Sequence, residues 1–278
     1  MLKIFVDSGS SIKQEEKETY KVEIIPLKIL IDGKEYEDGI DLTFDIFYDA
    51  LINKDIFPKT SLPNLIKLEE NVKECIKNGD DVLIITISSE ISSTFSTIKM
   101  LFEDEPKVQV VDSRLAVGGI RLLVMEANKY REESLEVVVR KIEELIPRIR
   151  ILAVPETLDY LHKGGRLSAM SFFVGKLLKI KPLITFKEGK VSVFSKERGL
   201  NGAMKVIVEE LNKCDTKFKI IPSYTYNDNN LKELISRVDD QYKNAMAEYD
   251  NLDPAIASHW GPNAFGFIYV EKKNWLIH

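Results

Sequence analysis

The sequence predicts an α/β protein of two domains, and two observations support this. The first is size: 278 residues, 44% of them apolar, suffice for two hydrophobic cores. The second is a change of pattern near residue 150. Before it, short β-rich runs alternate with helix-period segments, which favours a three-layer α/β/α arrangement around a parallel sheet. After it, the pattern favours a two-layer α+β arrangement with a mixed sheet. The expected domains are residues 1–152 and 153–278.

The first elements of the N-terminal domain are two extended runs and a capped helix. Leu2–Val6 is the expected opening strand, and Pro26–Ile31 is a second extended run, closed by the turn signal Asp32-Gly33. Thr43 is the expected cap of an amphipathic helix. The apolar side chains of that helix are Phe44, Phe47, Tyr48 and Leu51.

The rest of the N-terminal domain continues the alternation. Pro63 opens a helix that ends at Asn78-Gly79, because glycine commonly follows the last helical turn. Val82–Ile87 is a continuous apolar run, which predicts a strand buried on both faces. A strand at 108–111 and helices at 115–130 and 135–146 complete the domain.

The C-terminal half has the pattern of antiparallel strands. Pro182–Phe186 and Val191–Phe194 flank a short charged turn, as the two strands of a hairpin would. The remaining expected elements are a helix at 200–211, a strand at 218–221, a charged helix at 231–242 and a final strand at 265–270.

Composition excludes several classes of function. The 39 basic residues are outnumbered by 44 acidic ones, and the net charge of −5 gives no attraction to nucleic acid or anionic lipid. Cys75 and Cys214 have no CxxC spacing, and no signal peptide or membrane-spanning run is present, so we expect a soluble cytoplasmic protein. Three histidines, one of them terminal, make a metal site improbable. Neither GxGxxG nor a Walker motif occurs, and no cofactor is expected.

The densest polar segment is Ser88–Ser96, which follows the predicted buried strand and precedes a helix. The carboxyl ends of parallel strands border a crevice, and a helix N-terminus there offers unpaired N–H groups to an anion. Ser92, Ser93 and Thr94 would add hydroxyl donors. Ordinary helix capping explains the same residues equally simply.

Four further polar segments carry weaker signals. Thr60-Ser61 precedes a helix and Pro63, so capping is a full explanation of these hydroxyls. Arg166 follows two glycines and has the chemistry to pair with a carboxylate or phosphate, although a solvated arginine is equally expected. His259 lies close to the last strand, and a lone histidine is more often a packed residue. The acidic stretch 32–41 departs from calcium-loop spacing and is interpreted as a solvated loop.

A hydrolase is the enzymatic alternative. Ser92, Asp112 and His259 occur in the chain order that α/β-hydrolases use. However, the chain has no GxSxG motif, whose glycines allow a nucleophile to occupy a strained turn.

Seven short motifs occur in a fixed order across about 260 residues, and although no single motif is specific, the whole series is. The segments are Val6–Ser8, Pro26–Asp38, Lys59–Pro63, Ser88–Phe95, Val111–Ser113, Gly164–Arg166 and His259–Ala264. In this order they resemble the motifs of the DegV family of bacterial fatty-acid-binding proteins along the whole chain.

This resemblance implies a carrier that binds a long-chain fatty acid without covalent attachment and presents its carboxylate to a partner fatty acid kinase. Thr60 and Ser92 would donate hydrogen bonds to the carboxylate, with Ser93 as a further donor. His259 and Arg166 would support the acyl head or its phosphorylated form, or contact the kinase. The chain itself would not be an enzyme. A hydrolase using Ser92 and His259, and a regulatory module without lipid, remain the alternatives.

Two positions depart from the family pattern, because Ser93 and Asn263 stand where the family usually has glycine. A positive φ would strain Ser93, whereas asparagine tolerates this conformation best among the other residues. The apolar candidates for lining the acyl tail, most of them equally good core residues, are Phe172, Phe173, Leu177, Leu178, Ile184 and Phe265.

Overall fold

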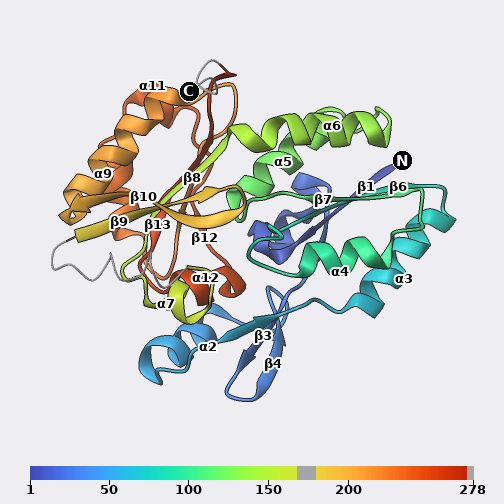
Figure 1. The fold of residues 1–278 in the computed structure, drawn as a ribbon, viewed down its shortest axis with the longest axis horizontal. Helices are drawn as coiled ribbons and strands as arrows, with labels where there is room; N and C mark the ends of the chain where they lie inside the picture. The colour runs from blue at the N-terminus through green and yellow to red at the C-terminus, as the bar shows by residue number, and fades with distance from the viewer. Residues whose placement is uncertain (168–179, 274–278) are drawn as a thin grey trace. The chain divides into compact units, whose positions relative to one another are not determined.

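The computed structural model describes residues 1–167 and 180–273, and its chain divides into two compact units (Figure 1). Unit 1 comprises Met1–Pro147 together with Asp253–Ile256. Unit 2 comprises Arg148–Leu252 and the chain from Ala257 onward. The domain ranges 1–152 and 153–278 stay a prediction, and the units are described below one at a time.

Unit 1 contains a parallel sheet with the strand order β2-β1-β6-β7. β1 pairs in parallel with both β2 and β6, and β6 pairs in parallel with β7. The apolar run at 82–87 forms the inner strand β6, so the prediction of a strand buried on both faces is confirmed. The four strands are β1 (Leu2–Asp7), β2 (Glu23–Ile25), β6 (Asp81–Thr86) and β7 (Val108–Asp112).

Helices cover both faces of this sheet, as Figure 1 shows, which confirms the predicted three layers. On one face, Val82 and Ile84 of β6 belong to a core cluster with Leu68 and Val72 of α3 and Ile98 of α4. On the other face, α6 packs against β6 and β7. The helices of unit 1 are α1 (Lys17–Tyr20), α2 (Phe44–Tyr48), α3 (Leu65–Lys77), α4 (Thr94–Leu101), α5 (Gly118–Lys129) and α6 (Leu135–Leu145).

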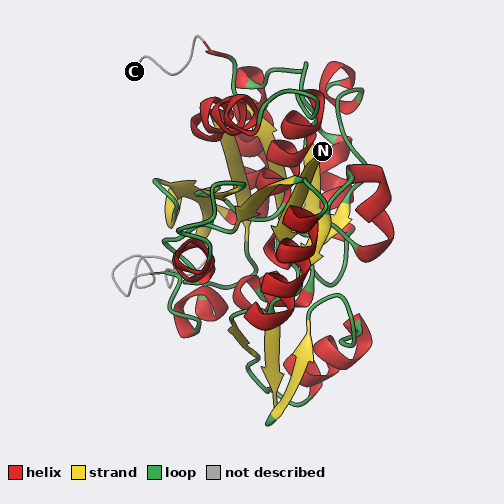
Figure 2. Ribbon diagram, turned by 90° about the vertical axis from the view of Figure 1, so that its right-hand side faces the viewer, coloured by secondary structure: helices red, strands yellow, loops and turns green. Residues whose placement is uncertain are grey.

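A small antiparallel sheet, with the order β4-β3-β5, also belongs to unit 1 and lies at the bottom of the view in Figure 2. Its strands are β3 (Lys28–Ile31), β4 (Lys34–Glu37) and β5 (Lys59–Ser61). The interpretation of residues 32–41 as a solvated loop is therefore wrong. Asp32 and Gly33 both have positive φ and form the tight turn of a hairpin, so residues 34–37 pair with β3.

Unit 2 is built on a six-stranded mixed sheet with the order β10-β9-β8-β13-β11-β12. All neighbouring pairs are antiparallel except β11 and β12, and the predicted hairpin at 182–194 forms β9 and β10. The strands are β8 (Ile149–Val154), β9 (Ile180–Lys187), β10 (Lys190–Arg198), β11 (Ile221–Tyr224), β12 (Asp250–Asn251) and β13 (Phe265–Val270).

Helices of unit 2 pack against this sheet and give the predicted two layers. α9 packs on β9 and β10, and α10 packs on β11 and β13. The core between them includes Leu152, Leu183, Met204, Leu231 and Phe267. The helices are α7 (Asp159–Lys163), α9 (Gly199–Glu210), α10 (Asn229–Ser236), α11 (Asp240–Lys243) and α12 (Pro254–Trp260), of which α12 begins within the segment assigned to unit 1.

Two local predictions in the C-terminal half are wrong, and a helix there was missed. The strand expected at 218–221 is shifted, because the Phe218 N–H donates to Asp215 O in a turn and β11 begins at Ile221. The helix expected at 231–242 is two helices, since Asp239 adopts an extended conformation between α10 and α11. Helix α12, which carries His259, was not predicted.

No helix within residues 1–167 and 180–273 is long and apolar enough to cross a lipid bilayer.

Gly266 provides a test of the packing of unit 2. It lies in β13, between β8 and β11, and a Cβ at this position would lie 2.1 Å from the carbonyl oxygen of Leu152. Because that oxygen belongs to the backbone of an inner strand, we expect Gly266→Ala to destabilise the protein by about 1–3 kcal/mol or more. Denaturant unfolding would measure this, and an unchanged midpoint would contradict the packing.

Candidate functional site

The hydroxyl-rich segment lies in unit 1 between the end of β6 and the start of α4, as predicted. Ser92 Oγ lies 2.8 Å from the Thr94 hydroxyl and accepts a hydrogen bond from the Thr94 N–H at 3.3 Å. Ser93 occupies the cap position of α4, but its side chain makes no capping hydrogen bond. Capping is therefore not the role of the Ser93 hydroxyl, and the Ser92 hydroxyl is held in place by Thr94.

Asp112 fixes the beginning of the same segment. Its carboxylate accepts hydrogen bonds from both the N–H and the hydroxyl of Ser89, and from the N–H of Arg114. A hydrolase would need this carboxylate to orient a histidine. In the structure it holds the loop that precedes Ser92 instead.

Thr60 lies in β5 of the small sheet, opposite Ile29 of β3, and is half-buried. The interpretation of Thr60 as a helix cap is wrong. Asn64 caps α3, since its side-chain oxygen accepts the N–H of Lys67 at 3.2 Å. Thr60 therefore does not cap α3.

Unit 2 brings His259 and Arg166 together. A Cβ on Gly164 would lie 2.3 Å from His259 Nδ1, so only glycine allows this close approach. Arg166 donates a hydrogen bond to the carbonyl oxygen of Gly164. Gly164, Arg166 and His259 therefore form one compact polar group.

The electrostatics of this group favour an anion. Burial, and then the positive charge of Arg166, lower the pKa of His259 to about 3, so its imidazole is neutral at pH 7. Burial also lowers the pKa of Arg166, but an arginine remains charged. A partly buried cation beside a neutral ring with one N–H donor suits a carboxylate or a phosphate.

The two departures from the family pattern have different conformations. Ser93 has a φ of −78°, so a side chain there introduces no backbone strain. Asn263 has a φ of 61°, in the left-handed region that asparagine tolerates. Its side chain donates a hydrogen bond to Glu156 Oε2 at 2.5 Å and accepts one from the Asn227 amide. These two hydrogen bonds fix the loop that follows His259.

The predicted tail contacts divide into two groups. Ile184 and Phe265 are buried residues of unit 2, and Phe265 belongs to its main core cluster. Phe172, Phe173, Leu177 and Leu178 lie outside the described residues.

Sequence reasoning missed Asp38, which follows β4. It was assigned to the solvated loop, but its side chain is fully buried. Burial, and then the charge of Asp253, raise its pKa to about 8, against the opposing effects of Ser8, the Ala255 N–H and Lys13. The Asp32-Gly33 hairpin signal could have found it, because pairing of residues 34–37 with β3 brings the next residue back to Leu27, whose carbonyl accepts the Asp38 N–H.

The fold and these groups define an α/β protein with a parallel sheet in one unit, a mixed sheet in the other, and polar groups suited to an anionic ligand. The sequence profile described as "Uncharacterised protein, DegV family" matches residues 1–272. The chain belongs to the DegV family.

Relatives of known sequence or structure agree with this assignment. A DegV domain-containing protein of Caldanaerobacter subterraneus is 30% identical over 276 residues, covering 97% of this chain and 98% of the relative. The fatty acid binding DegV family protein of Streptococcus agalactiae is 29% identical, with a TM-score of 0.86 and coverage of 98% and 99%. A stearic-acid-binding protein of Eubacterium ventriosum is 25% identical, with a TM-score of 0.86 and coverage of 99% and 100%.

The contact between Gly164 and His259 predicts an NMR result. In the wild type, the His259 ring should not titrate between pH 5 and 8, because its pKa is lowered to about 3. Gly164→Ala should displace the ring, change its burial and move its chemical shifts. Unchanged His259 shifts in that variant would contradict the close approach.

The burial of Asp38 predicts a specific dependence of stability on pH. Because its pKa is raised to about 8 in the folded state, the folded protein binds the proton more tightly than the unfolded chain does. Its contribution to stability is present at low pH and is lost as the pH rises from about 4 toward 8.

Asp38→Asn should remove the contribution of Asp38 to the pH dependence of the free energy of unfolding. The asparagine keeps an oxygen that accepts the Ala255 N–H. Between pH 5 and pH 8, the free energy of unfolding of the variant should gain at least about 1.4 kcal/mol relative to the wild type, the equivalent of one pKa unit. Urea titrations measure the free energy of unfolding of both proteins at each pH. If wild type and Asp38→Asn change in parallel with pH, Asp38 is not a buried, protonated acid.

Proposed function

We propose that this chain binds a long-chain fatty acid non-covalently and presents its carboxylate to a partner fatty acid kinase. The observation that carries the proposal is the Ser92 hydroxyl, held by Thr94 at the start of α4. Support comes from relatives described as binding fatty acids, which are 25–29% identical over nearly the whole chain.

In this proposal the carboxylate accepts hydrogen bonds from Thr60, Ser92 and the N–H of Ser93. Hydrogen bonds to an ionised group are about twice as strong as those between neutral groups, and a helix N-terminus adds its positive dipole end. The acyl chain supplies most of the affinity, since about 15 methylenes give roughly 12 kcal/mol of gross transfer free energy before ordering costs.

We further propose that His259 and Arg166 serve the phosphorylated head group or the contact with the kinase. The neutral imidazole donates one hydrogen bond, and Arg166 contributes the positive charge that an acyl phosphate requires. The chain needs no general base of its own in this scheme, because the ionised carboxylate has no proton to lose before it attacks the phosphoryl group. Its role is to orient the carboxylate oxygen for attack.

The hydrolase alternative has less support from the geometry. Asp112 is bonded to Ser89 and Arg114, and the Ser92 hydroxyl to Thr94. We therefore expect no hydrolysis of p-nitrophenyl esters of any chain length. Turnover that Ser92→Ala abolishes would replace the carrier proposal with the hydrolase.

Substitution of the hydroxyl donors tests the carboxylate contacts. Ser92→Ala and Thr60→Val should each weaken the binding of oleate or stearate by about 10- to 100-fold, because each removes a charge-assisted hydrogen bond worth roughly 1.5–3 kcal/mol. Isothermal titration calorimetry with delipidated protein measures this.

Each variant has a matched control in the neighbouring hydroxyl. Ser96→Ala on α4 removes only a bond to the Ser93 carbonyl, and Ser61→Ala on β5 alters an exposed residue. Both controls should bind as the wild type does. A loss of affinity shared equally by controls and test variants, or by none of them, would contradict the assignment of Thr60 and Ser92.

A further inference from the structure

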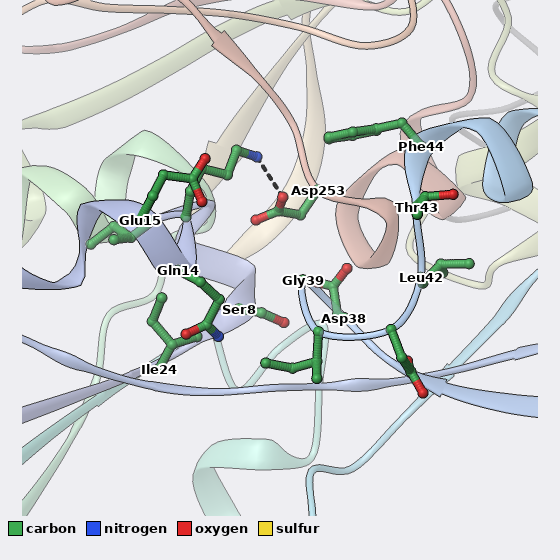
Figure 3. A pocket seen from close by; sticks show the side chains of 14 residues that line it. Ser8, Gln14, Glu15, Ile24, Asp38, Gly39, Leu42, Thr43, Phe44 and Asp253 are labelled. Carbon is green, nitrogen blue, oxygen red and sulfur yellow. Dashed lines mark hydrogen bonds and ion pairs between the residues drawn. The ribbon is translucent and has the colours of Figure 1, made fainter.

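Unit 1 contains a pocket of about 480 Å³ that the proposed function does not use (Figure 3). Thr60, Ser92 and Ser93 are not among its lining residues. The apolar residues of its lining are Ile12, Ile24, Ile40, Leu42 and Phe44. The polar residues of the lining are mainly acidic and include Lys13, Glu15, Asp38, Asp41 and Asp253.

Asp38 lines this pocket with a carboxyl group that is only partly satisfied. Its Oδ1 accepts the N–H of Ala255 at 3.2 Å, and the carboxyl group also has a hydrogen bond with the Ser8 hydroxyl. Its Oδ2 has no hydrogen-bond partner among the described residues, although the side chain is fully buried. A buried carboxyl oxygen without a partner is costly, and it marks a position where a ligand can donate.

The charges around Asp38 do not balance. Asp253, which is 5% exposed, is near enough to raise the pKa of Asp38, and Lys13 is ion-paired with Asp253. Arg121 is engaged by Glu16 at 3.3 Å and by the carbonyl of Ser11. Two buried carboxyl groups thus share the ammonium group of Lys13, and the charge of Arg121, which also acts on Asp253, is matched by Glu16. A proton on Asp38 balances the charge of these buried groups, while Glu15 and Asp41 of the lining add further negative charge.

We propose that this pocket binds a small organic cation, an ammonium or guanidinium group on a short aliphatic stem, which replaces the proton on Asp38. The cation donates to Oδ2 of Asp38, and its stem packs on Leu42 and Phe44, which lie on the same side of the pocket (Figure 3). A metal ion fits less well, because the described residues contain no cluster of three side chains suited to hold one. Since Asp38 has no exposed surface, a side chain of the wall changes rotamer when the cation enters.

The test compares two probes of the same shape and different charge. Calorimetric titration of the full chain with n-butylguanidinium should show binding that n-butylurea does not show. The affinity should tighten about tenfold per pH unit up to pH 8 and then level off, since one proton leaves for each cation bound. The released proton should make the measured binding enthalpy depend on the ionisation enthalpy of the buffer.

Two variants locate the site. Asp38→Asn should weaken binding of n-butylguanidinium at pH 8.5 at least tenfold and remove the pH dependence. Asp41→Asn, at an exposed residue of the same wall, should change it less than about threefold. Equal binding of the urea, no binding at pH 8.5, or full affinity in Asp38→Asn would each overturn the proposal. If Asp38→Asn does not fold, the proposal is tested on the wild type alone, by the pH dependence of n-butylguanidinium binding and by the comparison with n-butylurea.

Discussion

One buried carboxylate joins the carboxyl ends of two neighbouring strands of the parallel sheet, just before the segment Ser88–Ser96. Asp7, the last residue of β1, accepts the N–H of Ile87 at 2.7 Å and the N–H of Gly9 at 2.9 Å. Burial raises its pKa to about 7, while these two amide donors lower it. Because Ile87 directly follows β6, this contact sets the point from which the chain enters the segment that carries Ser92.

From that point each local interaction supports the next. Ser89 is held by Asp112 at the end of β7, and Thr94 holds the Ser92 hydroxyl at the first turn of α4. Because β2, β1, β6 and β7 are parallel, their carboxyl ends lie at the same end of the sheet. Ser8, which lines the pocket of Asp38, lies at this end as well, directly after β1. Ser8 and Ser92 therefore lie where parallel strands leave the sheet, whereas Thr60 lies in the small antiparallel sheet and Asp38 directly follows its strand β4.

Most of the fold was predictable from the sequence, because periodicity and turn residues encode it locally. The apolar run 82–87 predicted an inner strand, and Asp32-Gly33 signalled a tight turn. The serine segment was recognised for the same reason, since it follows a strand and precedes a helix. Asp38 was missed because its burial results from the pairing of β4 with β3 and from contacts with residues more than 200 positions away, such as Ala255. Periodicity does not report contacts of that kind.

The roles proposed for Thr60, Ser92, Ser93, His259 and Arg166 depend on a bound fatty acid. Native mass spectrometry of the freshly purified protein, followed by organic extraction, tests that claim most directly. A stoichiometric adduct that leaves as a free long-chain fatty acid is the predicted result, and delipidated protein should regain the adduct from added stearate or oleate. A protein that carries no acyl chain and takes none up from a panel of fatty acids would contradict the account.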